Sequence, residues 1–70
     1  MIKITINTEN AAFHNEYDPA SDTFYKFSEV ARILDKLAKR LDPEQGGDTP
    51  PIRLMDINGN CVGICEEVDD

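Results

Sequence analysis

Four oxygen-bearing side chains near the end of this 70-residue sequence have a spacing that could bind calcium. Asp56, Asn58, Asn60 and Glu67 stand at positions one, three, five and twelve of a calcium-loop pattern. Position six of that pattern needs glycine, and here it is Cys61. A hairpin turn explains the same Asp and Asn residues, so we expect a turn at this place and no calcium site.

A second group of chemically competent side chains is His14 with Glu16 and Asp18. Such a trio could form an acid–base or metal cluster. However, His14 is the one histidine of the sequence, and its surroundings read as a loop without a pocket. We therefore interpret His14 as a solvated loop residue.

The two cysteines, Cys61 and Cys65, could form a redox or metal pair. On a strand, a separation of four residues places them about 13 Å apart. A disulfide needs Cα atoms within about 7 Å. Two cysteines are also too few for a structural zinc site without further ligands. We expect two free thiols in a reducing cytoplasm, no cofactor, and no catalytic constellation, which makes an enzyme the least favoured function.

A long amphipathic helix is predicted between Asp22 and Leu41, because apolar residues recur there in alternating steps of three and four. The stripe is widened by Val30, Ile33 and Leu37, and we expect it to face the core. Its members are Phe24, Phe27, Ala31, Leu34, Ala38 and Leu41.

The start of this helix is less well defined by the sequence than its end. Asp18, Asp22 or Ser28 could each act as N-cap, and the phase of the stripe favours a start between residues 19 and 23. Asp42 precedes Pro43, and a residue before proline avoids the α region, so the helix should end there.

Strands are predicted on both sides of the helix. Residues 1–7 alternate apolar and polar side chains, which is typical of a half-buried strand. Residues 52–57 and 61–68 read as a hairpin with two possible turns. A two-residue turn at Asn58 and Gly59 is one; a type I turn over Ile57 and Asn58 with Gly59 as a bulge is the other.

The bulged turn is favoured by the hydrophobic pattern, because it gathers four apolar residues on one face. In that register Leu54 is opposite Val62 and Ile52 is opposite Ile64. The outer face would then carry Arg53, Met55, Cys61, Gly63 and Cys65.

Along the chain, one strand pattern is followed by the helix pattern and then by two further strand patterns. This order predicts one small α+β domain over residues 1–70, with a β-α-β-β arrangement and one helix packed on a three-stranded antiparallel sheet. Residues 43–51 are rich in proline and glycine and are expected to form a mobile linker between helix and hairpin. A chain this short has a small core, so an enclosed active site is not expected. Neither a signal peptide nor a transmembrane run is recognised, which predicts a cytoplasmic protein.

Charge is the other strong feature of the sequence, with 14 acidic and 7 basic residues and a formal net charge of −7. The helical segment holds five basic residues against three acids, so the excess of acids lies elsewhere. Such a surface repels nucleic acid and attracts basic proteins. The candidate partner-binding acids are Glu9, Glu16, Asp18, Asp42, Glu44, Asp48, Asp56, Glu66, Glu67, Asp69 and Asp70.

Three segments of the chain resemble small acidic proteins encoded by bacterial prophages and mobile elements. They are residues 2–13 (IKITINTENAAF), 29–34 (EVARIL) and 56–60 (DINGN). Such proteins include anti-CRISPR inhibitors, so the resemblance implies a phage-type setting in a bacterial host cell, without assigning a role to any residue.

Two functions from different classes follow from these features. The first is an anti-CRISPR-like inhibitor that imitates nucleic acid and binds a basic nucleic-acid-handling protein, such as a CRISPR effector subunit. It would contact neither nucleic acid nor membrane directly. The alternative is a structural or regulatory interaction module without mimicry, which docks through an apolar or mixed surface.

Overall fold

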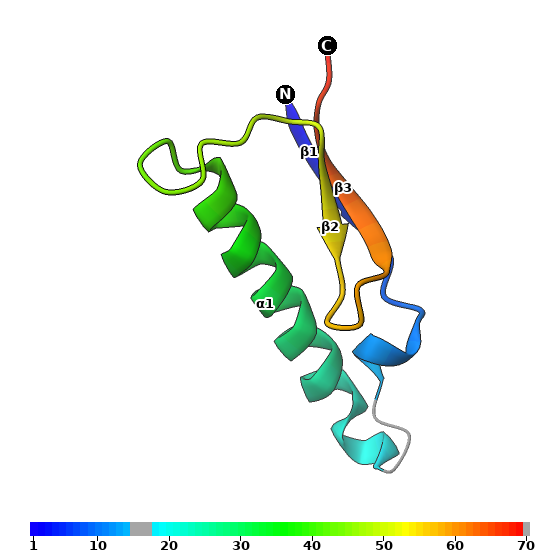
Figure 1. Cartoon of the computed structure of the whole chain (residues 1–70). Helices are drawn as coiled ribbons and strands as arrows, with labels where there is room; N and C mark the ends of the chain where they lie inside the picture. Colours follow the sequence, from blue (N-terminus) through cyan, green and yellow to red (C-terminus); the bar gives the residue numbers. More distant parts are fainter. Residues whose placement is uncertain (15–17, 70) are drawn as a thin grey trace.

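The computed structural model describes residues 1–14 and 18–69, and the strands and helix follow the expected order (Figure 1). They are β1 (Ile2–Ile6), α1 (Asp22–Leu41), β2 (Ile52–Met55) and β3 (Cys61–Glu67). Two short 3-10 helices, η1 (Ala11–Phe13) and η2 (Pro19–Ser21), lie between β1 and α1. The strands form one antiparallel sheet in the order β1-β3-β2. The β-α-β-β, α+β fold is therefore confirmed.

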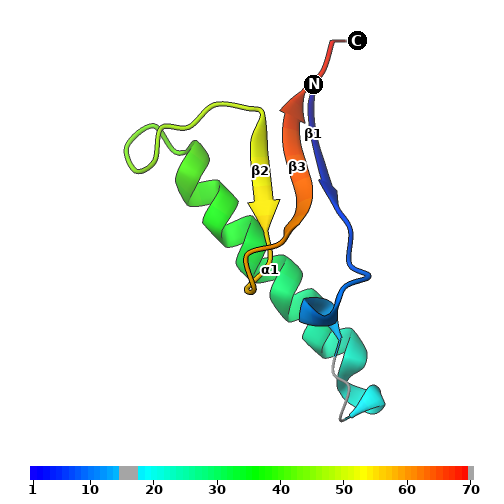
Figure 2. The same cartoon turned by 45° about the vertical axis from the view of Figure 1, so that its right-hand side comes forward.

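The central strand β3 holds the sheet together and brings the two ends of the chain side by side (Figures 1 and 2). Ile4 of β1 lies opposite Cys65 of β3. Beyond the strand ends, the Met1 ammonium donates to the Val68 carbonyl at 3.0 Å, and the Asn7 N–H donates to the Val62 carbonyl at 2.7 Å. The long central strand thus fixes β1 at both of its ends.

The hairpin between β2 and β3 has the bulged turn that the sequence favoured. The Gly59 N–H donates to the Asp56 carbonyl at 3.1 Å, and the Asp56 N–H donates to the Asn60 carbonyl at 2.9 Å. Gly59 has a φ of +85°, the left-handed conformation that glycine adopts without strain. Met55 then lies opposite Cys61, as this turn requires.

The register expected for the rest of the hairpin is wrong by one residue. Leu54 lies opposite Gly63 and Ile52 opposite Cys65, because a second irregularity between Leu54 and Met55 leaves Val62 as an extra residue on β3. Strict alternation could not direct both Val62 and Cys65 into the core, since they are three residues apart. With the bulge both are buried, so Cys65, expected on the outer face, belongs to the core.

The helix α1 begins at Asp22, within the expected range, and ends at Leu41. The loop that follows folds back over its last turn, because the Gly46 N–H donates to the Lys39 carbonyl and the Asp48 N–H donates to the Arg40 carbonyl. These bonds satisfy carbonyls that have no partner inside the helix.

The face of α1 that packs inward differs from the expected stripe. Leu37 is 3% exposed and Ile33 is equally buried, whereas Phe24 is 79%, Phe27 62% and Leu34 40% exposed. The assignment of Ile33 and Leu37 to the core is confirmed; the assignment of the other three is wrong. The helix is rotated so that half of its apolar surface faces solvent.

The core lies between α1, η1 and the sheet, on the side of β2 (Figure 2). Phe13 of η1 is completely buried, while Ile2 and Ile4 on the edge strand β1 remain exposed. The buried apolar residues are Ala12, Phe13, Ile33, Leu37, Ile52, Leu54, Val62 and Cys65.

Two aspartate substitutions one helical turn apart test the orientation of α1. Leu37→Asp should unfold the protein, because an unpaired buried carboxylate costs several kcal/mol, comparable with the roughly 3–5 kcal/mol expected for a core of this size. Leu34→Asp should leave the thermal midpoint nearly unchanged, since its side chain is already in contact with water. Circular dichroism melting curves measure both. Unfolding by Leu34→Asp with a folded Leu37→Asp would refute the orientation.

Candidate functional site

Asp56, a candidate for both calcium and partner binding, has a structural role in the hairpin turn. It is 4% exposed. Its Oδ1 accepts hydrogen bonds from the N–H groups of Asn58 and Asn60, both at 2.9 Å. Its Oδ2 accepts from Asn10 Nδ2 at 2.7 Å and from Asn60 Nδ2 at 3.2 Å. Both oxygens are satisfied from within the chain, so Asp56 is withdrawn from the candidate surface.

The protonation of Asp56 reflects this environment. Burial raises the pKa of its carboxyl, but the hydrogen bonds from Asn60, Asn10 and Asn58 together hold the pKa below its ordinary value. Asn10 also accepts a hydrogen bond from the Ala12 N–H at 3.0 Å, which caps η1. Through its hydrogen bond with Asn10, the charged carboxylate of Asp56 therefore joins η1 to the hairpin turn.

Glu29 joins the helix to the same turn. It is 7% exposed and lies on the buried face of α1. Arg32 donates to both of its carboxylate oxygens, at 2.5 and 3.1 Å, and the Ile57 N–H donates to Oε2 at 2.9 Å. The hydrogen bond from Arg32 lowers the pKa of Glu29 and outweighs burial, which raises it. The same pairing raises the pKa of Arg32.

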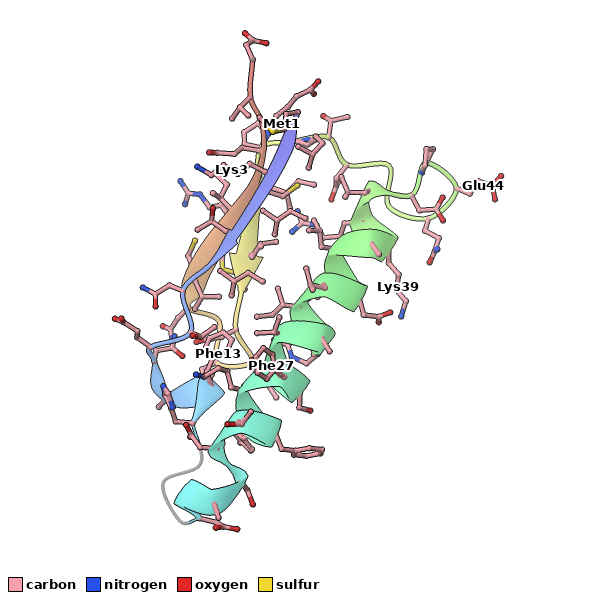
Figure 3. The ribbon with its side chains drawn as sticks, turned by 180° about the vertical axis from the view of Figure 1, so that it is seen from behind. Met1, Lys3, Phe13, Phe27, Lys39 and Glu44 are labelled. Carbon is pink, nitrogen blue, oxygen red and sulfur yellow. The ribbon has the colours of Figure 1, made fainter. Side chains whose placement is uncertain are left out.

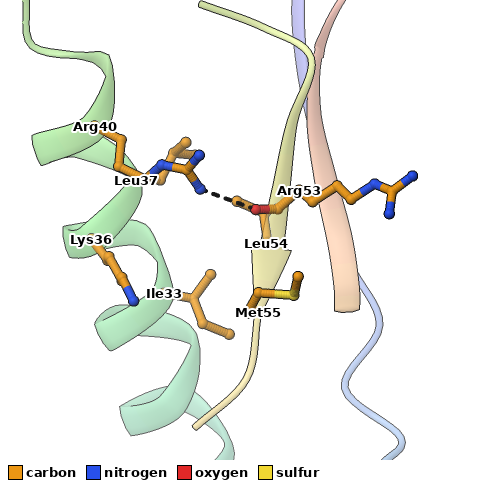
Figure 4. A pocket seen from close by; sticks show the side chains of 7 residues that line it. All are labelled: Ile33, Lys36, Leu37, Arg40, Arg53, Leu54 and Met55. Atoms are coloured by element: carbon orange, nitrogen blue, oxygen red, sulfur yellow. Dashed lines mark hydrogen bonds between the residues drawn. The ribbon is translucent and has the colours of Figure 1, made fainter. Parts of the chain in front are cut away.

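Two arginines of α1 also cover the free edge of the sheet at β2. Arg32 donates to the Met55 carbonyl at 3.3 Å. Arg40 donates to the Arg53 carbonyl, also at 3.3 Å (Figure 4). Edge strands with bare carbonyls invite pairing with other chains. The arginines occupy two of these acceptors and orient the helix along the strand.

A narrow hollow lies between α1 and β2 beside Arg40 (Figure 4). Its volume of about 40 Å³ would admit a water molecule or two and no substrate. The Arg53 side chain extends away from the helix (Figure 4). The hollow is lined by Ile33, Lys36, Leu37, Arg40, Arg53, Leu54 and Met55.

The candidate acids separate into two groups in space. Glu9 and Asp18 lie toward the end of the molecule where α1 begins, whereas six others lie at the opposite end, around the termini and the loop after α1 (Figures 1 and 3). Glu16 and Asp70 fall outside the described residues. We call the six residues at the second end the acidic end; they are Asp42, Glu44, Asp48, Glu66, Glu67 and Asp69.

Several candidate acids already have partners within the chain. Asp48 pairs with Arg40 at 2.9 Å. Asp18 accepts from the Ala20 N–H and the Ser21 hydroxyl, which caps η2. Asp42 accepts from the Glu44 N–H, which lowers its pKa, and from the Gln45 side chain. The structure gives these three carboxylates local structural roles.

The remaining candidates are available to solvent. Across residues 1–14 and 18–69, no ion pair or side-chain hydrogen bond involves the carboxylates of Glu9, Glu44, Glu66, Glu67 or Asp69. All but Glu66 are exposed. Of the four exposed residues, Glu44, Glu67 and Asp69 belong to the acidic end.

His14 and the two cysteines are the other candidates for chemistry among the described residues. The His14 ring lies 3.2 Å from the Asp22 carboxylate at the start of α1, so this half-buried histidine interacts with the helix rather than with solvent alone. Cys61 is exposed and Cys65 buried, and both are free thiols. Within the part of the chain that the structure describes, no group of three metal-binding side chains comes together.

The surface that sequence reasoning missed is the outer stripe of α1, by which we mean Phe24, Phe27, Ala31, Leu34 and Ala38. All five residues are exposed. The sequence held a signal for this: alternating steps of three and four give a period of 3.5, which is typical of a seam between two helices. The expectation that this stripe faces the protein's own core is therefore wrong for these five residues.

Comparisons with known proteins do not identify the chain. No family model matches it, and neither a curated protein nor a solved structure shows significant similarity. Among the described helices, none has the length and apolar character needed to cross a membrane.

The tie between Glu29 and the hairpin turn predicts a dependence of stability on pH. Because its pKa is lowered in the folded state, Glu29 stabilises the fold fully above the ordinary value of 4.5, and this contribution is lost as the pH falls through the lower folded value. In urea unfolding, Glu29→Gln should be clearly less stable than the parent at pH 7, and the difference should narrow in acid. Glu44→Gln, which changes an exposed side chain, is the control and should match the parent at neutral pH. An equal Glu29→Gln deficit at both pH values would contradict the tie.

Proposed function

We propose that this chain is a non-catalytic inhibitor that binds a basic, nucleic-acid-handling protein through its acidic end. The observation that carries the proposal is the exposure of Glu44, Glu67 and Asp69 at one end of the molecule, without a counter-ion among the residues described. Figure 3 shows Glu44 on the loop and Met1, beside the C-terminal strand, at this same end. A lysine- and arginine-lined surface would be attracted by these charges, which the Met1 ammonium at the Val68 carbonyl and Lys3 opposite Glu66 offset only in part.

The basic residues of the chain support this charge distribution. Arg32 is held by Glu29, Lys39 by Asp35 and Arg40 by Asp48. These three cations are occupied inside the molecule, which retains a formal net charge of −7. Arg40 neutralises Asp48 of the acidic end, and none of the three cations forms an ion pair with Glu44, Glu67 or Asp69.

Inhibition would follow from competition for the same cations. Carboxylates spaced along a loop and a strand end would take the places of phosphates at lysine and arginine contacts of the target. A CRISPR effector subunit is the proposed target, because such complexes hold nucleic acid in positively charged channels and because the sequence resembles prophage proteins that include anti-CRISPR inhibitors.

A second candidate function is an interaction module without mimicry. It is favoured by the outer stripe of α1, where two phenylalanines and a leucine face solvent. An exposed apolar patch of this kind marks a binding surface. Salt separates the two functions, because electrostatic mimicry weakens as salt rises and apolar docking does not.

Charge-neutral substitutions test the proposed inhibitor directly. Glu67→Gln combined with Asp69→Asn should lower the affinity for the target by about tenfold at low salt, because two charges facing its cations are removed. The measurement is competition between this protein and target DNA for purified CRISPR effector complexes, at low and physiological salt. Exposed carboxylates contribute little to stability, so the melting curve should not change.

The matched control is Glu9→Gln combined with Asp35→Asn. It changes the net charge by the same amount, but away from the acidic end, and it should compete nearly as well as the parent. If both double variants lose affinity equally, net charge alone is responsible and the acidic end has no special role. If neither loses affinity, or if the parent fails to compete, nucleic-acid mimicry is refuted.

A further inference from the structure

We propose that the outer stripe of α1 is covered by the same stripe of a second copy of this chain, with the two helices antiparallel. The inference is independent of the proposed inhibitor function, because it concerns Phe24, Phe27, Ala31, Leu34 and Ala38 and none of the acidic end. It is carried by the period of the stripe, its exposure, the order of large and small residues along it, and the charge at the two ends of the helix.

The period of the stripe fits a helix as the occupant. Its members alternate by three and four residues from Phe24 to Ala38, which keeps them along one nearly straight line on α1. The core contacts of the helix use another line, through Glu29, Ile33 and Leu37. The second line therefore remains free for a helix outside the molecule.

The exposed area is large enough to matter for association. At exposures of 79% and 62%, Phe24 and Phe27 leave on the order of 300 Å² per copy in water, given about 200 Å² for an aromatic side chain. With Leu34 and the alanines on both copies, a helix pair would bury on the order of 1,000 Å² in total. That value is near the lower bound for a specific interface, so the dimer should be weak and dependent on concentration.

The order of side-chain sizes favours the antiparallel arrangement. If Ala31 lies against Leu34 of the second copy, then Phe27 lies against Ala38, and Phe24 lies near Leu41, which is partly buried against its own core. Each of the central layers then combines one large and one small side chain. A parallel pair in register would place alanine against alanine and leave voids between layers of paired phenylalanines.

Charge favours the same arrangement. The first turn of α1 is acidic, with Asp22, and its last turn is basic, with Lys39 and Arg40. Within each copy these groups already have partners, because Asp22 pairs with His14, Lys39 with Asp35 and Arg40 with Asp48. The helix dipoles therefore supply the preference, since antiparallel helices place the positive end of one dipole beside the negative end of the other. They also keep the two loops that carry Glu44 about 30 Å apart, whereas parallel helices would place these acidic loops side by side.

Sedimentation equilibrium across a concentration series tests whether the dimer exists. The parent should dimerise with a dissociation constant on the order of 10 µM to 100 µM, and more tightly at higher salt, because salt screens the repulsion between two acidic molecules. Phe27→Glu should remain monomeric with an unchanged melting curve, since the side chain is exposed. Ile4→Glu, an equally polar change at another exposed apolar position, should dimerise like the parent.

Cysteine cross-linking tests the orientation of the helices in a Cys61→Ser background. The variant with both Phe27→Cys and Ala38→Cys should form an intermolecular disulfide under mild oxidation, whereas Phe27→Cys alone should not. Cross-linking by Phe27→Cys alone would show parallel helices and overturn the proposed geometry.

Three other outcomes would overturn the proposal as a whole. A parent that is monomeric throughout the series, or one that binds a different protein through Phe27 while remaining monomeric, would show that the stripe is not covered by a second copy. A dimer that Ile4→Glu abolishes and Phe27→Glu does not would place the interface on the edge strand β1. In each case the competition with DNA measured for the acidic end is unaffected, so the two proposals fail separately.

Discussion

The buried carboxylate of Glu29 determines how the helix meets the sheet. It accepts hydrogen bonds from Arg32 in the next turn of α1 and from the Ile57 N–H in the hairpin turn. Arg32 and Arg40 extend the same line of contact to the carbonyls at the edge of β2. With these bonds made, Ile33 and Leu37 must face the core, because they lie on the same side of the helix. The phenylalanines, on the other side, must then face solvent.

This constraint explains which parts of the structure the sequence could predict. The bounds of α1, the strands and the bulged turn at Gly59 follow from local patterns that act within a few residues. The inward face of α1 does not, because it depends on a bond between Glu29 and a backbone group 28 residues away. The stripe with Phe24 and Phe27 holds more apolar residues than the line with Glu29, so hydrophobicity alone favours it as the buried face. Glutamate is rarely buried, and the sequence therefore gives no reason to expect Glu29 in the core.

The same difference between local and distant causes applies to the candidate site. Asp56 reads as a turn residue from its neighbours, and the turn is present. The satisfaction of its carboxylate inside the molecule, however, also depends on a hydrogen bond from Asn10, which comes from another part of the chain. Likewise, the position of Cys65 follows from the extra residue Val62, which alternation along β3 does not reveal. The carboxylates of Glu67 and Asp69, by contrast, accept no hydrogen bond from the described residues and are exposed.

The molecule therefore separates its acidic residues by role. Glu29 and Asp56 are buried and hold the helix, η1 and the hairpin together, while the acids of the acidic end remain at the surface. The apolar residues of α1 are separated in the same way, one line for the core and one for solvent. The exposure of the second line of apolar residues follows from the orientation that Glu29 imposes on α1.

The most direct test of this account is the pH titration of the Ile57 amide by NMR. If Glu29 accepts its hydrogen bond, the Ile57 N–H resonance should move as the carboxylate is protonated, with a midpoint below the ordinary value of 4.5. That movement should disappear in Glu29→Gln while the resonances of Asn58 and Asn60, which report on Asp56, still titrate. An Ile57 titration that is unchanged in Glu29→Gln would contradict the account.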